Sequence, residues 1–411
     1  MPKNLSPAEA MEWLLAQGKG PGLVYAAGCA GEPTLFAETL VQLGPRDHGL
    51  TFTGVWIPGV NKIDWGALGA AETFFLSPAL RPSFEAGRTR YLPRAYTDIY
   101  PYLETAPLRA AMVQVSPPNA EGLCSLGVAN DFTPAVLGRG APLVAHLNPA
   151  MPFIPSAETI PYEDIDVAVE AERPLLTYDA GTVTPDLEAI AQHIADLLPP
   201  NPTLQFGLGK VQKAVLEQLQ DRSFSIHAGM ISDPVLPLLD KVSSITTGVA
   251  LGSPALYEAM LDAPQVQFAP VSHTHDIGTL RSLPNLVAIN SVVEVDLFGQ
   301  ANAEFVGQRQ MSGAGGLVDF LRGARLAGGL PIIALPSTAK KGTVSRIVPH
   351  LAAGLPASIA RGDECIVVTE QGVADLRGLD IEAKARALIK VAHPQHRDAL
   401  TQKWTTMRSA L

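Results

Sequence analysis

Cysteine is scarce in this chain: only Cys29, Cys124 and Cys365 occur among its 411 residues, and they lie far apart. Three scattered thiols are too few for a disulfide framework or a zinc site, so the sequence predicts neither. We expect these side chains to be small buried hydrophobic groups rather than reactive thiols.

Positive charge is also in short supply. Lys and Arg number 30 against 40 Asp and Glu, which gives a formal net charge of −10. This balance argues against nucleic acid or an anionic membrane surface as the partner. A site for a polyanionic ligand would have to be assembled locally, from single Lys or Arg side chains and backbone amides.

The sequence shows no apolar run long enough to span a bilayer and no charged, apolar, small-residue leader. We therefore expect a cytoplasmic location. Hydrophobic residues are abundant at 47%, while charged residues make up only 17%, so the chain has ample material for a core and disorder is not expected. Its length exceeds that of a usual single domain, which predicts two domains.

The first helix can be read from its ends. Ser6 can cap it, Pro7 suits its first turn, Glu9 completes a capping box, and Gly18 would stop it. Beyond this helix, one pattern of strand, glycine turn and helix occurs twice, over residues 22–43 and again over residues 203–219. The two copies lie about half the chain apart, which favours two related α/β halves, although the pattern is a common one.

The apolar pattern breaks at residues 172–174 and again at 179–186. We place the domain boundary there, with an N-terminal α/β domain over 1–180 and a C-terminal α/β domain over 181–411. Short strands alternate with helical runs on both sides, which predicts an α/β fold with mostly parallel sheets. Ligands of such sheets bind at the carboxyl ends of the strands, where the glycine turns fall.

Glycine clusters are the most informative feature of the second half. The run from Ser312 to Gly316 precedes a helical stretch over 317–326 and predicts a strand-to-helix turn against which something packs closely. Bare N–H groups and the positive end of a helix dipole at such a turn suit an anion or a polarised carbonyl. The turn at Gly207, Gly209 and Lys210 could hold a phosphate in the same way, or be a tight turn with no ligand.

Several stretches resemble the acetyl-CoA hydrolase/transferase family, which includes the 4-hydroxybutyrate and acetate CoA-transferases of class I. They are VSPPNAEGLCSLGVANDFTPAVL (115–137), FGLGKVQKAVLEQL (206–219), INSVVEVDLFGQANAEFVGQ, SGAGGLVDFLRGA, LPSTAKKGTVSRIVP, VVTEQGVADLRG and Ala392-His393-Pro394. The resemblance implies two open α/β domains with the active site in the cleft between them. It also implies coenzyme A or an acyl-CoA and a small carboxylic acid as substrates, no metal, and a homodimer or larger assembly.

Residue roles carried over from the resemblance cover three loops. The family's CoA-contacting loop corresponds to Gly207, Leu208, Gly209, Lys210 and Val211, with Gln212 where the family usually has Pro. Gly313, Gly315 and Gly316 correspond to the loop beside the thioester, which could supply oxyanion-type N–H donors. Lys340, in the polar loop that also holds Lys341, Ser345 and Arg346, could neutralise CoA phosphates, whereas Lys341 is better read as a solvated charge.

The family's nucleophile has no counterpart in this chain. The glutamate sits in a stretch that reads roughly His-Thr/Ser-Glu-Met followed by Ser-Asp, and residues 226–233 here read IHAGMISD. His227, Met230, Ser232 and Asp233 fall into register, so Gly229 occupies the place of the glutamate. A glycine cannot form the acyl anhydride and glutamyl-CoA thioester of ping-pong transfer.

Four explanations stay open. Another carboxylate could reach the cleft, with Glu121, Glu294, Glu304 and Glu370 as candidates. Glycine could instead make room for water, with His227 or Asp233 as general base, which would make a thioesterase. The chain could bind acyl-CoA without turnover, or the glutamate could come from a different chain.

A metal site at His273 and His275, two apart on an expected strand, lacks a third ligand in the sequence.

Overall fold

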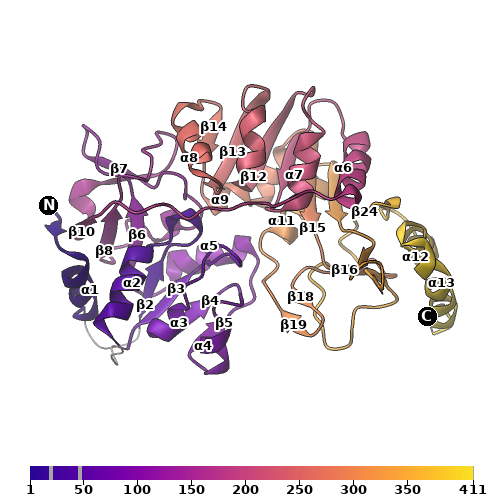
Figure 1. The fold of residues 1–411 in the computed structure, drawn as a ribbon, viewed down its shortest axis with the longest axis horizontal. Coiled ribbons are helices and arrows are strands. Elements are labelled where there is room, and N and C mark those ends of the chain that lie inside the picture. The colour runs from indigo at the N-terminus through magenta and orange to yellow at the C-terminus, as the bar shows by residue number, and fades with distance from the viewer. Residues whose placement is uncertain (18–21, 45–48, 411) are drawn as a thin grey trace.

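The computed structural model describes residues 1–17, 22–44 and 49–410. Its N-terminal half is built on an eight-stranded sheet in which all neighbouring strands run parallel (Figure 1). In spatial order the strands are β1 Lys3–Asn4, β10 Val167–Glu170, β8 Leu143–Leu147, β6 Leu108–Val115, β2 Leu23–Ala26, β3 Thr51–Gly54, β4 Ala70–Thr73 and β5 Thr89–Tyr91.

The C-terminal half contains a second eight-stranded sheet, parallel except for its last pair, β24 and β25. In spatial order the strands are β14 Val266–Phe268, β13 Val242–Ala250, β12 Phe224–Ile231, β11 Thr203–Phe206, β15 Leu286–Ser291, β20 Leu330–Ala334, β24 Ile366–Thr369 and β25 Gly372–Asp375. The predicted α/β fold with mostly parallel sheets is confirmed.

Helices alternate with the strands in both halves. Those of the first half are α1 Pro7–Leu15, α2 Thr34–Leu43, α3 Trp65–Leu68, α4 Arg81–Glu85 and α5 Tyr96–Thr105. Those of the second half are α6 Pro185–Leu197, α7 Lys210–Glu217, α8 Pro254–Ala259, α9 Val271–Thr274, α10 Ile277–Ser282, α11 Leu317–Leu326, α12 Ile381–Val391 and α13 Pro394–Arg408. Within the described ranges, none of the helices combines the length and the apolar character needed to cross a bilayer.

Short strand pairs decorate the loops. In the second half they are β16 Glu294–Asp296 with β17 Ala301–Asn302 and β23 Ile347–Val348, β18 Phe305–Val306 with β19 Arg309–Gln310, and β21 Thr338–Ala339 with β22 Val344–Ser345. In the first half, β7 Leu123–Ser125 pairs with β9 Thr159–Pro161. Figure 1 shows β18 and β19 on the side of the second half that faces β4, β5 and α4.

The helix ends that the sequence predicted are largely in place. Ser6 and Glu9 form the expected capping box at α1, with Pro7 in its first turn. The expected stop at Gly18 lies outside the described residues. α11 begins at Leu317 and ends at Leu326, as predicted. The helix predicted over 211–219 begins one residue earlier and ends two residues earlier, because α7 spans Lys210–Glu217.

One buried cluster runs through both halves. It joins Tyr25 and Val113 of the first sheet to Ile226 and Val249 of the second. A further cluster belongs to each half alone. In chain order, the first sheet finishes with β10, which ends at Glu170, and the second sheet starts with β11, which begins at Thr203. The predicted boundary between residues 180 and 181 falls in this connecting segment and stays a prediction.

Candidate active site

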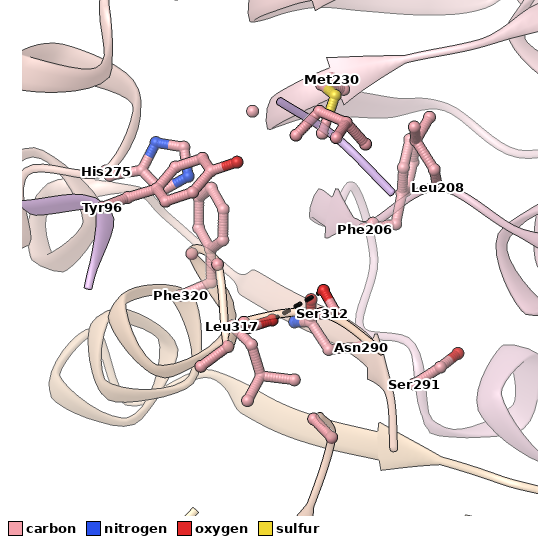
Figure 2. A pocket seen from close by; sticks show the side chains of 18 of the residues that line it. Tyr96, Phe206, Leu208, Met230, His275, Asn290, Ser291, Ser312, Leu317 and Phe320 are labelled. Carbon is pink, nitrogen blue, oxygen red and sulfur yellow. Dashed lines mark hydrogen bonds between the residues drawn. The ribbon is translucent and has the colours of Figure 1, made fainter. Parts of the chain in front are cut away.

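A cavity of about 270 Å³ lies where the two halves meet, at the carboxyl ends of β11, β12 and β15 (Figure 2). The first half contributes Ile57, Pro58, Phe75 and Tyr96 to its wall. The second half contributes the end of β11 with Gly207 and Leu208, Gly229 and Met230, His275, Asn290, Ser291, Ala303, and residues 312–317 with Phe320. Its position matches the rule that open parallel sheets bind ligands beyond the carboxyl ends of their strands.

Hydrogen bonds beside the cavity tie the two halves together. The Thr97 hydroxyl on α5 donates to the Asp319 carboxylate on α11 at 2.9 Å. Asp319 is buried, and burial raises the pKa of its carboxyl to about 6 although the bonds from Thr97 oppose this. Arg81 donates to the Gln310 carbonyl at 2.5 Å on the neighbouring edge. These bonds hold Tyr96, the first residue of α5, against the N-terminal end of α11.

The structure brings together six of the residues that the sequence singled out. Gly207, Leu208, Gly229, Gly313, Gly315 and Gly316 all line the cavity. They come from three segments that are far apart in the sequence, namely the turn after β11, the strand β12 and the turn before α11. The predicted loops therefore share one site, although the ligand roles given to their residues stay predictions.

Other predicted ligand contacts lie away from the lining. Gly209 caps α7 with φ +134°, a conformation that favours glycine, and Lys210 and Val211 open that helix. Lys340 stands in the turn between β21 and β22. None of these four residues lines the cavity. They could contact only a portion of the ligand that extends beyond it.

Two glycines of the 312–316 turn are explained by neighbouring protein atoms. A Cβ on Gly313 would lie 2.8 Å from the carbonyl oxygen of Phe74, and one on Gly316 would lie 2.3 Å from Nε2 of His275. Gly315 adopts φ +62°, which also favours glycine. The close packing that the sequence predicted is real, but at Gly313 and Gly316 the packing partners are Phe74 and His275.

The two predicted general bases point elsewhere. His227 is buried and its Nε2 donates to the Thr274 carbonyl at 3.0 Å, and burial lowers the pKa of its ring to about 4. Asp233 accepts from the Ser253 backbone N–H at 2.8 Å and from the Ser253 hydroxyl at 3.1 Å, beside a separate hollow near Lys213. Neither side chain lines the cavity around Gly229.

The alternative carboxylates are also engaged elsewhere. Glu294 accepts from Asn302 at 3.1 Å, Glu304 accepts from Ser358 at 2.8 Å, and Glu370 accepts from the Ser337 backbone N–H at 2.7 Å. Glu121 lies in an exposed turn. Glu370 is followed by the hairpin strand β25. Among the described residues, no Asp or Glu side chain lines the cavity.

His275 is the residue of the wall that sequence reasoning misplaced. His273 lies in α9 and His275 directly follows that helix, so the expected strand is wrong. The His275 ring packs between Tyr96 and Phe320, with centroids 4.8 and 4.4 Å away. Burial, with a smaller contribution from His227, lowers the pKa of this ring to about 3, so it is neutral at physiological pH. The described part of the chain holds no group of three or more potential metal ligands.

A buried amide pair forms another polar part of the wall that the sequence did not indicate. The Asn290 side chain at the end of β15 donates to Oε1 of Gln205 on β11 at 2.9 Å. The two strands are parallel neighbours. Each residue is the next to last of its strand and lines the cavity. This pairing could have been predicted only from the strand order. In Figure 2, Tyr96, His275 and Phe320 gather on one side of the cavity, and Phe206, Leu208 and Met230 on the other.

Comparisons with known proteins agree with the resemblance seen in the sequence. Residues 252–404 match the family described as "Acetyl-CoA hydrolase/transferase C-terminal domain". The chain is 35% identical to the 4-hydroxybutyrate coenzyme A transferase of Clostridium kluyveri, over 93% of each chain. The crystal structure of RipA from Yersinia pestis superposes with a TM-score of 0.89 at 28% identity, covering 99% of this chain and 98% of that one. A 4-hydroxybutyrate CoA-transferase from Porphyromonas gingivalis superposes with a TM-score of 0.80 at 30% identity, covering 98% of both.

Proposed function

Because the chain belongs to the acetyl-CoA hydrolase/transferase family, we propose that it binds a short acyl-CoA in the cavity and cleaves the thioester with water. The family acts on acyl-CoA thioesters by transfer or by hydrolysis. One observation favours hydrolysis here: Gly229 stands where the nucleophilic glutamate is expected, and no Asp or Glu among the described residues lines the cavity.

The cavity is matched to the reacting end of the ligand rather than to all of it. A space of about 270 Å³ suits a thioester and a short acyl chain, against the larger volumes of pockets that enclose whole drug-sized ligands. The nucleotide of CoA would then lie outside, where Lys210 and Lys340 are available as solvent-exposed cations. Apolar side chains such as Phe206, Leu208 and Met230 would face the acyl group or the pantetheine arm.

The reaction needs no covalent bond to the protein. The oxygen of water attacks the thioester carbonyl carbon, the carbonyl becomes an oxyanion, and the C–S bond breaks as the carbonyl re-forms. The proton lost by the water ends on the departing thiolate, so the products are a carboxylic acid and CoA thiol. Backbone N–H groups of the 312–316 turn would stabilise the oxyanion, a contribution that is worth about 10²–10³-fold per donor in other acyl-transfer enzymes.

Transfer of CoA between carboxylic acids is the reaction that the names of the relatives describe. In this chain it would need a carboxylate nucleophile, and Glu294, Glu304 and Glu370 are all hydrogen-bonded outside the cavity. Their present partners would have to be exchanged before any of them could reach a thioester at Gly229. Hydrolysis requires no such rearrangement, because the attacking water does not have to be carried by a side chain.

Turnover of acetyl-CoA and butyryl-CoA by the purified protein tests the proposal. Thiol release would be followed with a thiol reagent, and acyl exchange with isotopically labelled acetate in excess. We expect free CoA to accumulate without label entering the acyl-CoA pool. Labelled acyl-CoA formed by the unmodified protein would overturn hydrolysis, and binding without either product would leave a CoA-binding protein.

A further inference from the structure

Two glycines from different elements face the same histidine ring. A Cβ on Gly229 in β12 would lie 2.9 Å from Cε1 and 3.2 Å from Nε2 of His275. A Cβ on Gly316, just before α11, would lie 2.3 Å from the same Nε2. Real Cβ atoms essentially never approach another heavy atom more closely than 3.0 Å. The ring therefore fills the side-chain space of both glycines.

The ring has little freedom to yield. It is 2% exposed and lies between the rings of Tyr96 and Phe320, and its Nδ1 is 2.9 Å from the Thr274 hydroxyl. A ring that contacts two aromatic neighbours and a hydroxyl cannot shift by an ångström without disturbing those contacts. A side chain at residue 229 would have to displace the ring or bend the strand.

The hydrogen bond at Nδ1 indicates which ring nitrogen carries the proton. The Thr274 hydroxyl donates to the Pro270 carbonyl at 3.3 Å, the usual bond of a threonine to the preceding turn of a helix. A hydroxyl has one hydrogen. In the tautomer that leaves this hydrogen on the Pro270 carbonyl, Nδ1–H of the ring donates to the hydroxyl oxygen and Nε2 keeps a lone pair. Within the described residues, no hydrogen bond to Nε2 is found, and Nε2 is the ring nitrogen that lies in the notch between Gly229 and Gly316.

We propose that His275 takes over the place of the missing residue-229 side chain, with Nε2 accepting a hydrogen bond from the water that attacks the thioester, and that glycine at 229 and 316 is required to admit the ring. As the water oxygen bonds to the carbonyl carbon, its proton passes to Nε2. The imidazolium then returns that proton to the departing CoA thiolate as the C–S bond breaks. This step rests on the proposed hydrolysis.

Geometry and charge agree on a modest role for the ring. His275 is neutral at pH 7 and so is ready to accept a proton, but burial makes it a weak base. It therefore serves chiefly to orient the water, and we expect its loss to lower kcat about 100-fold, at the low end for a positioned acid–base group. Contacts with the Tyr96 and Phe320 rings, which lie beside His275 in Figure 2, hold the direction of the ring.

The kinetic test uses His275→Phe and His275→Ala, with His273→Ala as the matched control because His273 is an exposed neighbour outside the lining. Phenylalanine keeps the packing and removes Nε2, so we expect kcat for acetyl-CoA hydrolysis to fall about 100-fold with KM little changed. In the alanine variant, added imidazole should restore part of the rate. An unchanged kcat in His275→Phe, or in His275→Ala if the former does not fold, would overturn the role.

The packing claim has a test of its own, with acyl exchange as the readout. Gly229→Glu alone should fail to transfer, because the ring occupies the space that the new side chain needs. Gly229→Glu combined with His275→Ala should exchange labelled acetate into acetyl-CoA. The packing claim would be overturned if Gly229→Glu alone exchanged as fast as the double variant, or if neither variant exchanged.

The two tests also separate this inference from the proposed function. If the unmodified protein releases no CoA, hydrolysis and the role of His275 in it both fail. The exchange result would still decide whether the ring excludes a side chain at 229. If the unmodified protein hydrolyses acetyl-CoA and His275→Phe does so equally well, the proposed function stands and the role of His275 falls.

Discussion

The two halves carry the same succession of strand, glycine turn and helix, yet the two turns differ in what surrounds them. After β2, a Cβ on Gly28 would lie 1.8 Å from the Val55 carbonyl oxygen, and the backbone of Cys29 is bonded at both N–H and C=O to the Asn61 side chain. After β11, a Cβ on Gly207 would meet only Asn290 Oδ1, at 3.8 Å.

This difference separates a structural glycine from one at a site. Gly28 is needed because Val55, directly after β3, packs against it, whereas Gly207 opens onto the cavity. The first turn is sealed by neighbours of its own sheet, and the second is left free for a ligand. The sequence pattern is the same in both, so the packing around a glycine turn decides its use.

The largest expected effect is on stability: alanine substitution should destabilise the protein strongly at the first turn and only slightly at the second. Gly28→Ala forces a Cβ into the Val55 carbonyl, so we expect a loss of about 3 kcal/mol or more in the free energy of unfolding. Gly207→Ala should change that free energy by less than about 1 kcal/mol, since its Cβ has room. Urea denaturation of both variants measures the pair.

The same substitution at Gly207 should have its main effect on ligand affinity. Gly207→Ala should weaken acyl-CoA binding about tenfold, the equivalent of 1.4 kcal/mol, because the methyl group enters the cavity. Full affinity in a folded Gly207→Ala variant, measured by calorimetry with butyryl-CoA, would show that the second turn is as closed to ligands as the first.

A buried acid sharpens the contrast further. Glu32, which ends the first turn, is 2% exposed and accepts from Nε1 of Trp65 at 3.1 Å. Burial raises the pKa of its carboxyl from 4.5 to about 7. The folded protein therefore holds a proton that the unfolded chain releases above about pH 4.5, so stability falls as pH rises from 4.5 through 7. We expect a loss of a few kcal/mol, about 1.4 kcal/mol for each unit of pKa difference.

Glu32→Gln removes this titration while keeping an acceptor for Trp65. Its free energy of unfolding should decline less between pH 5 and pH 8 than that of the unmodified protein, as followed by urea denaturation at each pH. A smaller decline remains, because Asp319, whose pKa burial raises to about 6, still titrates in this range. Glu38→Gln, at an exposed site on α2, serves as the control and should leave the decline in place. A decline of the same size in Glu32→Gln would show that titration of Glu32 does not cause the loss of stability.

The last expected effect, which depends on salt concentration, concerns the charges near the second turn. If Lys210 and Lys340 contact CoA phosphates, changing both to Ala should weaken CoA binding about tenfold at low salt, and less at high salt where the phosphates are screened. Lys341→Ala should bind CoA normally, because we expect that side chain to be solvated. Equal affinity of the double variant at both salt concentrations would take the two lysines out of the binding site.

Local signals in the sequence predicted much of the frame. The bounds of α11 and the capping box of α1 depend on neighbours within a few residues, so composition and spacing were sufficient. Alternation of short strands and helices also predicted the parallel sheets and the edge at which Gly207 and Gly316 meet, whereas Gly229 was assigned to the site only through the family resemblance.

The parts that could not be predicted depend on contacts between distant segments. His275 reaches the cavity because a short helix over 271–274 turns it toward α11, and no periodic pattern marks so short a helix. The meeting of Gln205 with Asn290 follows from the strand order, which places β11 beside β15. His227 was in register with the family motif, but its bond to the Thr274 carbonyl appears only once the chain is folded.

A single turnover of acetyl-CoA in ¹⁸O-labelled water, with protein in excess, tests the central claim most directly. Direct attack by water predicts one ¹⁸O atom in every acetate released and none added to the protein. Acetate released with two unlabelled oxygens, together with ¹⁸O in a Glu or Asp side chain, would show a carboxylate nucleophile and contradict direct attack by water.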